Sequence, residues 1–206
     1  MRTVIWYFDF VSPFAYIGLQ RLKELPADIS IEYRPVLFAG ILNHWGQKGP
    51  AELPTKRRYT YRWSHWTATQ LGLPFKYPAA HPFNPLHHLR LAIACGSKFE
   101  AIRMIFEEVW TTGADASDPG RFSALCAKLG IADIGQEAKD RLRKNTDEAV
   151  HKGVFGVPTF EADAELFWGA DSIEFLKAFL ANPSVVKNQE MQRLDALPVA
   201  AARRTS

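Results

Sequence analysis

The first residues of the chain alternate between strand-like and helix-like patterns. Residues 3–8 form a nearly unbroken apolar run and residues 29–34 alternate apolar with polar positions, and both patterns predict β-strands. Between them, residues 12–25 have the apolar spacing of a helix that ends before Pro26. The chain is therefore predicted to open with a strand, a helix and a second strand.

Strand patterning then disappears for more than a hundred residues, and helical patterning replaces it. Glycine and proline residues punctuate this part of the chain and divide it into separate helices. We expect helices near residues 51–71, 85–96, 98–112, 119–129 and 134–152. This block is predicted to be an all-helical insertion.

Strand patterning returns after Gly153, with strands expected over 157–161 and 165–168. Asp171 and Glu174 have the spacing of a capping box that opens a last helix, which is expected to stop before Pro183.

The order of elements predicts an α/β protein in which a βαβ unit and a ββα unit flank a helical insertion. We expect a discontinuous domain made of residues 1–53 and 153–206, and a helical insertion domain made of residues 54–152. The tail from about residue 183 is expected to be partly disordered, most of all over 198–206.

Composition places the chain among ordinary globular proteins. It has 206 residues, of which 47% are hydrophobic and 23% charged. We expect no membrane span, and no signal peptide because Asp9 cuts short the opening apolar run; a cytoplasmic location follows as the default. Cys95 and Cys126 are expected to be buried thiols, and the six histidines show no zinc-ligand spacing, so no metal is predicted.

Charge is nearly balanced, with a net value of +3, but one basic cluster is present. Lys56, Arg57, Arg58 and Arg62 alternate with aromatic residues. Nucleic-acid-binding proteins use such mixtures, yet a single patch on a nearly neutral chain favours an anionic small molecule. We therefore expect no nucleic-acid partner.

Ser12 is the first candidate for chemistry. It follows the apolar strand directly and stands at the start of the predicted helix, with Pro13 in the first turn. In one interpretation the hydroxyl only caps the helix. In the other, the hydroxyl and the free N–H groups of the helix end stabilise a thiolate or carboxylate placed beside them.

A second candidate lies far downstream, where Pro158 interrupts a strand-like run and the Val157-Pro158 bond is a candidate cis peptide. Together the two segments resemble the thioredoxin superfamily, in which the turn after the first strand and a cis-proline loop face each other across the active site. The cysteines of the Cys-x-x-Cys motif are replaced here by Ser12 and Ala15. Dithiol–disulfide exchange at this site is therefore excluded, because exchange needs a thiolate.

Longer segments narrow the resemblance to the DsbA-like branch that contains kappa-class glutathione transferases and 2-hydroxychromene-2-carboxylate isomerases. The segments that carry it are Phe8–Tyr16, Arg34–Phe38, Gly46–Pro50, Lys56–Arg58, Gly156–Phe160 and Phe167–Asp171. Phe83-Asn84-Pro85 is closer to the isomerases. The resemblance implies a thioredoxin-like fold interrupted by an all-helical insertion, and a homodimer.

The resemblance also implies that glutathione is the cofactor. Ser12 would be the catalytic residue that stabilises the glutathione thiolate. The cofactor-binding candidates are Gln47, Lys56, Val157, Pro158, Ala170, Asp171 and Ser172. Lys56 could equally be a solvated surface charge, and Asp171 a helix cap. Related sequences commonly carry asparagine at position 47 and arginine at position 172, so the γ-glutamyl end of glutathione meets a different environment here.

The reaction implied is the interconversion of 2-hydroxychromene-2-carboxylate and trans-o-hydroxybenzylidenepyruvate, by reversible addition of the glutathione thiolate to the substrate. The candidate residues for binding this aromatic carboxylate are His44, Lys48 and Asn84. Trp45, Trp63, Trp66 and Phe83 are candidate walls, although aromatics at helical spacing more often belong to the core.

Some family members have an Asn-Arg pair where this chain has Glu52-Leu53, which leaves the substrate open. Two other functions remain open as well. One is a kappa-class-like glutathione transferase or peroxidase, and the other is a non-catalytic peptide-binding module of thioredoxin fold.

Overall fold

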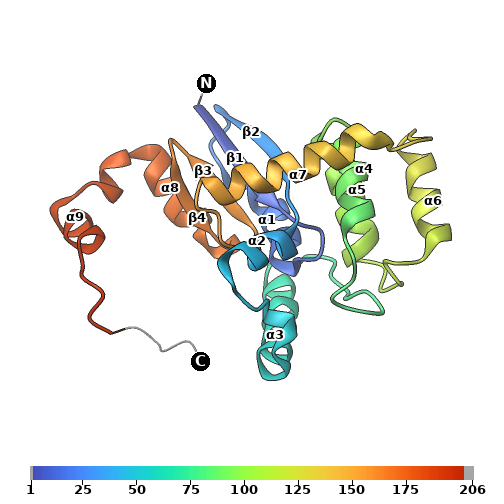
Figure 1. The fold of residues 1–206 in the computed structure, drawn as a ribbon, viewed down its shortest axis with the longest axis horizontal. Helices are drawn as coiled ribbons and strands as arrows, with labels where there is room; N and C mark the ends of the chain where they lie inside the picture. Colours follow the sequence, from blue (N-terminus) through green and yellow to red (C-terminus); the bar gives the residue numbers. More distant parts are fainter. Residues whose placement is uncertain (1, 202–206) are drawn as a thin grey trace.

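The computed structural model, which describes residues 2–201, is built around a four-stranded sheet (Figure 1). The strands have the order β2-β1-β3-β4. Strand β1 (Arg2–Phe8) runs parallel to β2 (Ile29–Pro35) and antiparallel to β3 (Thr159–Ala162), and β4 (Glu165–Trp168) forms the far edge. The two ends of the chain thus share one sheet, as the predicted α/β thioredoxin-like fold requires.

Alternation along β1 separates two cores. Val4, Trp6 and Phe8 face the larger core, while Ile5 and Tyr7 face the smaller one, because successive side chains of a strand point to opposite sides. The larger core holds α1 (Pro13–Arg21), α5 (Phe99–Trp110) and α8 (Ile173–Ala181), and the smaller core holds α2 (Phe38–Trp45). Helix α7 (Gly135–His151) contributes Leu142 to the larger core and Ala149 to the smaller one. The sheet is therefore covered by helices on both faces.

The helical insertion forms where the sequence predicts it. Its helices are α3 (Pro54–Gln70), α4 (Leu86–Ala94), α5, α6 (Pro119–Lys128) and α7. Helices α4, α5 and α6 gather at one end of the molecule, and α3 projects from the body (Figure 1). Helix α7 contacts both α4 and β2, so it joins the two parts, and the predicted domain boundaries stay a prediction.

Proline and local capping account for shifted boundaries. The helix expected from residue 51 is split into a 3-10 turn (Pro50–Glu52) and α3, because Pro54 disfavours helical geometry at Leu53. The helix expected over 12–25 ends as an α-helix at Arg21 and continues as one 3-10 turn (Leu22–Glu24).

Strand β3 begins two residues later than expected, at Thr159, because Pro158 has no N–H to give to a ladder.

Helix α2 is absent from the sequence prediction. Its first residues carry no polar side chain that could cap a helix locally. Instead the Phe38 N–H donates to Asp9 Oδ2 at 2.9 Å, and the Leu37 N–H donates to Thr146 Oγ1 at 2.9 Å. Both caps come from distant parts of the chain, so a local pattern could not reveal the helix.

The predicted capping box before α8 is wrong. A 3-10 turn (Ala170–Ser172) precedes the helix, the Ser172 hydroxyl donates to the Gly169 carbonyl oxygen at 2.7 Å, and no side chain caps α8. Asp171 therefore does not act as the helix cap that the sequence suggested.

The tail contains more structure than expected. A 3-10 helix η4 (Pro183–Val186) packs Val185 and Val186 against the larger core, and α9 (Gln189–Asp195) follows. Residues 198–201 have no regular structure, and 202–206 of the predicted disordered stretch lie outside the described residues.

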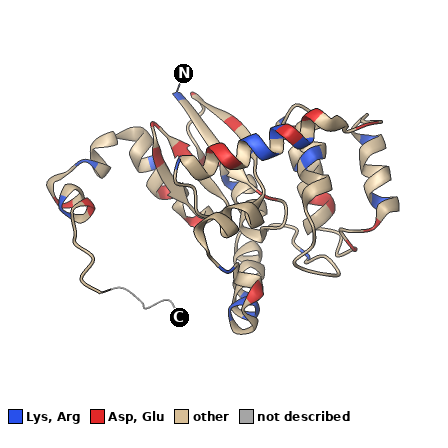
Figure 2. Cartoon of the chain, viewed as in Figure 1, with Lys and Arg blue, Asp and Glu red and all other residues tan. Residues whose placement is uncertain are grey.

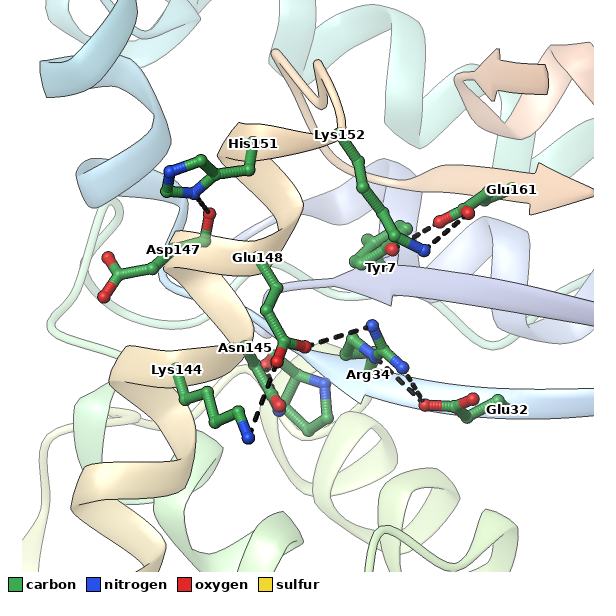
Figure 3. Close-up of polar contacts among 11 residues, drawn as sticks. Tyr7, Glu32, Arg34, Lys144, Asn145, Asp147, Glu148, His151, Lys152 and Glu161 are labelled. Atoms are coloured by element: carbon green, nitrogen blue, oxygen red, sulfur yellow. Dashed lines mark hydrogen bonds and ion pairs between the residues drawn. The ribbon is translucent and has the colours of Figure 1, made fainter. Parts of the chain in front are cut away.

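Polar contacts tie the insertion to the smaller core's side of the sheet (Figure 3). Arg34 on β2 forms ion pairs with Glu32 and with Glu148 on α7. Glu161 on β3 accepts hydrogen bonds from the Tyr7 hydroxyl at 2.5 Å and from Lys152 at 2.6 Å. Lys and Arg residues alternate with Asp and Glu along α7 (Figure 2), which supports its role as the charged outer cover of this face.

The structure also bears on the two cysteines and on membrane-spanning helices. Cys95 and Cys126 are partly exposed rather than buried, and both are free thiols. Among residues 2–201, no helix combines the length and the apolar character that crossing a membrane requires.

Candidate functional site

A cavity of about 720 Å³ lies beside the Ser12 turn. Its walls come from the turn between β1 and α1, from α2 and the loop after it, from α3, from the loop around His81, and from the loops on either side of β3 and β4. This volume falls within the range of small-molecule sites. The cavity therefore joins both ends of the sequence and the helical insertion.

The Ser12 turn and the proline loop face each other across this cavity. Ser12 Oγ accepts the Ala15 N–H at 3.2 Å and donates to the Val157 carbonyl oxygen at 3.4 Å. The Val157-Pro158 bond is cis, as predicted. The N-cap role of Ser12 is thereby confirmed, and its hydroxyl also reaches the loop that the resemblance places opposite it.

Two backbone donors remain free at this point. In the described part of the chain neither the Phe14 N–H nor the Val157 N–H has a hydrogen-bond acceptor, although Val157 lines the cavity. The first N–H groups of any helix lack a partner within the helix, and Phe14 lies in the first turn of α1. The two donors are therefore available to an acceptor that enters the cavity.

Asp9 holds the turn from below. Its side chain is fully buried and accepts the Val11 N–H at 3.0 Å and the Phe38 N–H at 2.9 Å. Burial raises the pKa of Asp9 to about 7, while the two N–H groups act in the opposite direction. A carboxyl group whose pKa burial raises toward neutrality therefore lies directly under the site.

Eight of the eleven predicted site residues line the cavity: Ser12, Gln47, Lys48, Lys56, Val157, Pro158, Ala170 and Asp171. They come from five separate stretches of the chain, which the fold brings together. The structure supplies their location, and their roles stay proposals.

The other three predicted residues are not among those that line the cavity. His44 is exposed on α2 and its ring lies edge-on to Trp45. Asn84 Oδ1 accepts the Leu86 N–H at 3.1 Å in a local turn that leads into α4, and Ser172 is bonded to Gly169. Each of these side chains already has a local structural partner.

Of the four candidate wall aromatics, Trp63 and Phe83 line the cavity, and Trp45 and Trp66 do not. Trp45 instead donates from Nε1 to the Val154 carbonyl oxygen at 2.9 Å.

Several lining residues were not predicted. The aromatic and titratable ones are Asp9, Phe14, Phe38, Glu52, Tyr59, Tyr61, His81, Phe155 and Trp168. The segments around Phe155 and Trp168 carried the family resemblance, and that signal could have drawn attention to them. Tyr61 and His81 come from the insertion, where helical spacing alone does not separate wall from core.

Aromatic pairs stand on two sides of the cavity. Phe155 and Trp168 have ring centroids 5.1 Å apart, and Tyr59 and Trp63 on α3 have centroids 6.0 Å apart. A Cβ on Gly156 would lie 2.5 Å from Trp168 Nε1, so only glycine lets this indole rest on the proline loop. These rings suit a flat apolar ligand.

Charged groups are also placed on these walls. Lys48 and Lys56 supply cations, and Glu52 and Asp171 supply carboxylates. Among the described residues, no group of His, Cys, Asp and Glu side chains is arranged to hold a metal ion.

Comparisons with known proteins show the family and the fold. The family model of the DSBA-like thioredoxin domain matches residues 3–181. A 2-hydroxychromene-2-carboxylate isomerase of Pseudomonas putida is 30% identical over 197 residues, covering 85% of this chain and 92% of that protein. Glutathione S-transferase kappa 1 of Homo sapiens is 25% identical, covering 87% of this chain and 91% of that one.

A solved structure of a 2-hydroxychromene-2-carboxylate isomerase has the same fold. It superposes with a TM-score of 0.74 at 25% identity, covering 92% of this chain and 98% of the other.

Proposed function

This chain belongs to the DsbA-like thioredoxin family, among the 2-hydroxychromene-2-carboxylate isomerases and kappa-class glutathione transferases, and on that premise we propose that it is a glutathione-dependent isomerase. Its substrate would be 2-hydroxychromene-2-carboxylate, and its product trans-o-hydroxybenzylidenepyruvate, in the breakdown of aromatic compounds. The cytoplasmic location and the homodimer expected from the sequence remain predictions.

The observation that carries the proposal is the Ser12 hydroxyl facing the cis Val157-Pro158 peptide beside two free N–H donors. A peptide-like cofactor can pair its main chain with the Val157 N–H, as an added strand would. Its thiol then lies near Ser12 and the Phe14 N–H. The residues present therefore fit glutathione, which when bound supplies a thiolate nucleophile.

Ser12 can favour the ionised thiol without losing its place. The bond from its hydroxyl to the Val157 oxygen is long, at 3.4 Å, so the proton can turn toward a sulfur at little cost. Oγ still accepts the Ala15 N–H and stays at the helix end. A hydroxyl and a helix N-terminus both lower the pKa of a neighbouring thiol.

Charged side chains on the cavity wall are complementary to the two charged ends of glutathione. We assign the glycyl carboxylate to Lys56, with Gln47 beside it, and the γ-glutamyl ammonium to Asp171. Ser172, bonded to Gly169, brings no cation to the γ-glutamyl carboxylate, whose partners would be the N–H groups of Ala170 and Asp171. We therefore expect weaker selectivity for this end than an arginine would give.

The substrate would lie between the aromatic pairs, with Lys48 as partner of its carboxylate. His44 and Asn84 have no part in this proposal because they lie off the cavity.

The test is Ser12→Ala. Loss of the hydroxyl should raise the pKa of bound glutathione by about one unit and slow turnover of the chromene about tenfold at neutral pH, since one unit of pKa is a factor of ten in thiolate. Ultraviolet absorption of the thiolate against pH gives the pKa, and the rates of variant and wild type should converge at alkaline pH.

Ser172→Ala is the matched control, since it removes a hydroxyl that does not face the cavity. Equal rates for Ser12→Ala and wild type across pH would contradict the role of Ser12. Product analysis separates the alternatives, because isomerisation returns free glutathione whereas a kappa-class-like transferase consumes it. No calorimetric heat with glutathione would favour the non-catalytic peptide-binding module.

A further inference from the structure

We propose that His81 is a positioning residue for the Ser12 turn, which it holds through the Val11 carbonyl while Tyr61 fixes its ring. The effect of this contact on the glutathione thiol rests on the proposed function, whereas the contact between His81 and Val11 is independent of it.

Hydrogen bonds at both ring nitrogens fix the orientation of the His81 imidazole. His81 Nε2 lies 2.8 Å from the Val11 carbonyl oxygen, which can only accept, so Nε2 carries a proton. Nδ1 lies 2.7 Å from the Tyr61 hydroxyl, and that hydroxyl is also 2.8 Å from the carbonyl oxygen of His81. Burial lowers the pKa of His81 and favours the neutral ring, so the single proton of the Tyr61 hydroxyl is shared between two acceptors, Nδ1 and the His81 carbonyl oxygen.

The turn depends on donors from outside. The Asp9 carbonyl oxygen accepts the Ser12 N–H at 3.1 Å within the turn. The next two carbonyls have side-chain donors from the insertion: Trp110 Nε1 bonds the Phe10 oxygen at 2.9 Å, and His81 bonds the Val11 oxygen. The peptides just before Ser12 are thus oriented by the helical insertion.

Val11 is held on both sides, since its N–H donates to Asp9 Oδ1 and its carbonyl accepts from His81. Without His81 this partly buried carbonyl would lose its partner, and the peptide that leads into Ser12 would be free to rotate. Ser12 Oγ would then lose its fixed distance from the Val157 loop.

Two features connect this contact with the reaction. His81 and Tyr61 line the same cavity as Ser12, whereas Trp110 is fully buried. The groups around His81 are otherwise aromatic, with Tyr77, Phe83 and Trp110 rings within 6.3 Å, and Arg57 is the nearby charge that acts on it. A ligand that touches Tyr61 or His81 therefore touches the support of the thiolate-stabilising turn.

The test compares His81→Leu with His81→Gln, which keeps an N–H donor at a similar reach. In ligand-free protein, hydrogen exchange of the bonded amides of Val11, Ser12 and Ala15 should be about tenfold faster in His81→Leu, the loss of one hydrogen bond, and close to wild type in His81→Gln. With glutathione, His81→Leu should raise the thiol pKa by about one unit, and His81→Gln should restore it.

His65→Leu, an exposed histidine of α3 outside the cavity, is the matched control. If His81→Leu does not fold, Tyr61→Phe replaces it and should speed the same amides about threefold. Equal exchange in His81→Leu and His81→Gln would overturn the inference. If wild type binds no glutathione, the proposed function fails, and the exchange measurement alone decides the role of His81.

Discussion

At the residue scale, Asp9 shows how one buried carboxyl can serve both folding and the site. It caps α2 across the molecule, holds the Val11 N–H, and lines the cavity. Its pKa is raised by burial to about 7 from an ordinary value of 3.8. The folded state therefore binds a proton that the unfolded state has already released at intermediate pH.

This predicts a specific pH dependence. A raised pKa contributes stability that is complete below about pH 4 and is lost as the pH rises to about 7, with a slope of at most about 1.4 kcal/mol per pH unit. The free energy of unfolding of wild type, measured with urea, should fall relative to Asp9→Asn between pH 5 and pH 8. Parallel profiles for the two proteins would contradict it, and Asp28→Asn, an exposed carboxylate, is the control.

Residues whose role follows from local chemistry could be predicted. Ser12 before Pro13 predicts a helix N-cap, and Val157-Pro158 predicts a cis peptide. The structure confirms both. Asn84 and His44 could not be placed in the same way. Whether a polar side chain turns to a cavity or to the nearest free N–H, as Asn84 does, depends on packing that the sequence does not display.

At the element scale, α3 is an unusual helix. Only Ser64 and Ala68 are buried along its length, yet one side of it lines the cavity with Tyr59, Tyr61 and Trp63. Because α3 has so few core contacts, its aromatic side chains contribute little to the stability of the protein. They are therefore available to contact a ligand.

Trp63 and Trp66 on this helix form a matched pair. Trp63 lines the cavity and lies 5.0 Å from Phe14 between ring centroids, whereas Trp66 is exposed away from it. We expect Trp63→Ala to raise the KM for the aromatic substrate about tenfold through lost ring contacts, and Trp66→Ala to leave it unchanged. Steady-state kinetics at saturating glutathione decides between them, and equal effects would exclude the aromatic wall.

Element prediction succeeded where the signal was local. The helices with their own apolar period, such as α5 and α7, lie within three residues of their predicted bounds. Helix α2 was missed because its N–H groups bond to Asp9 and Thr146, neither of which is near it in sequence.

At the scale of the whole molecule, the last helix stands apart. None of the residues of α9 is buried, and the family match ends before it, at residue 181. Val185 and Val186 just before it do pack against the core. We therefore expect the stability of the fold to depend on η4 and not on α9.

Truncation tests this border. Removing residues 188–206 should change the free energy of unfolding by less than about 0.5 kcal/mol, as surface changes do. Removing residues 183–206 should lower it by about 2 kcal/mol or more, because two apolar side chains leave the core. Thermal denaturation followed by circular dichroism compares the two, and an equal loss in both would place α9 in the fold.

The architecture as a whole was predictable because local hydrophobic patterns indicate each strand and most helices, and their order along the chain indicates the fold. The cavity was only partly predictable, since its walls meet only after the sheet has joined residues 2–35 to residues 159–168.

The central place of β1 has a consequence for how the protein is made. On the ribosome β1 and β2 emerge together, but the partner for the other edge of β1 follows roughly 120 residues later. Until then a strand rich in large apolar side chains has one open side, and a nascent neighbour could occupy it. Yield in a cell should therefore depend on chaperone supply and on translation speed across the middle of the message.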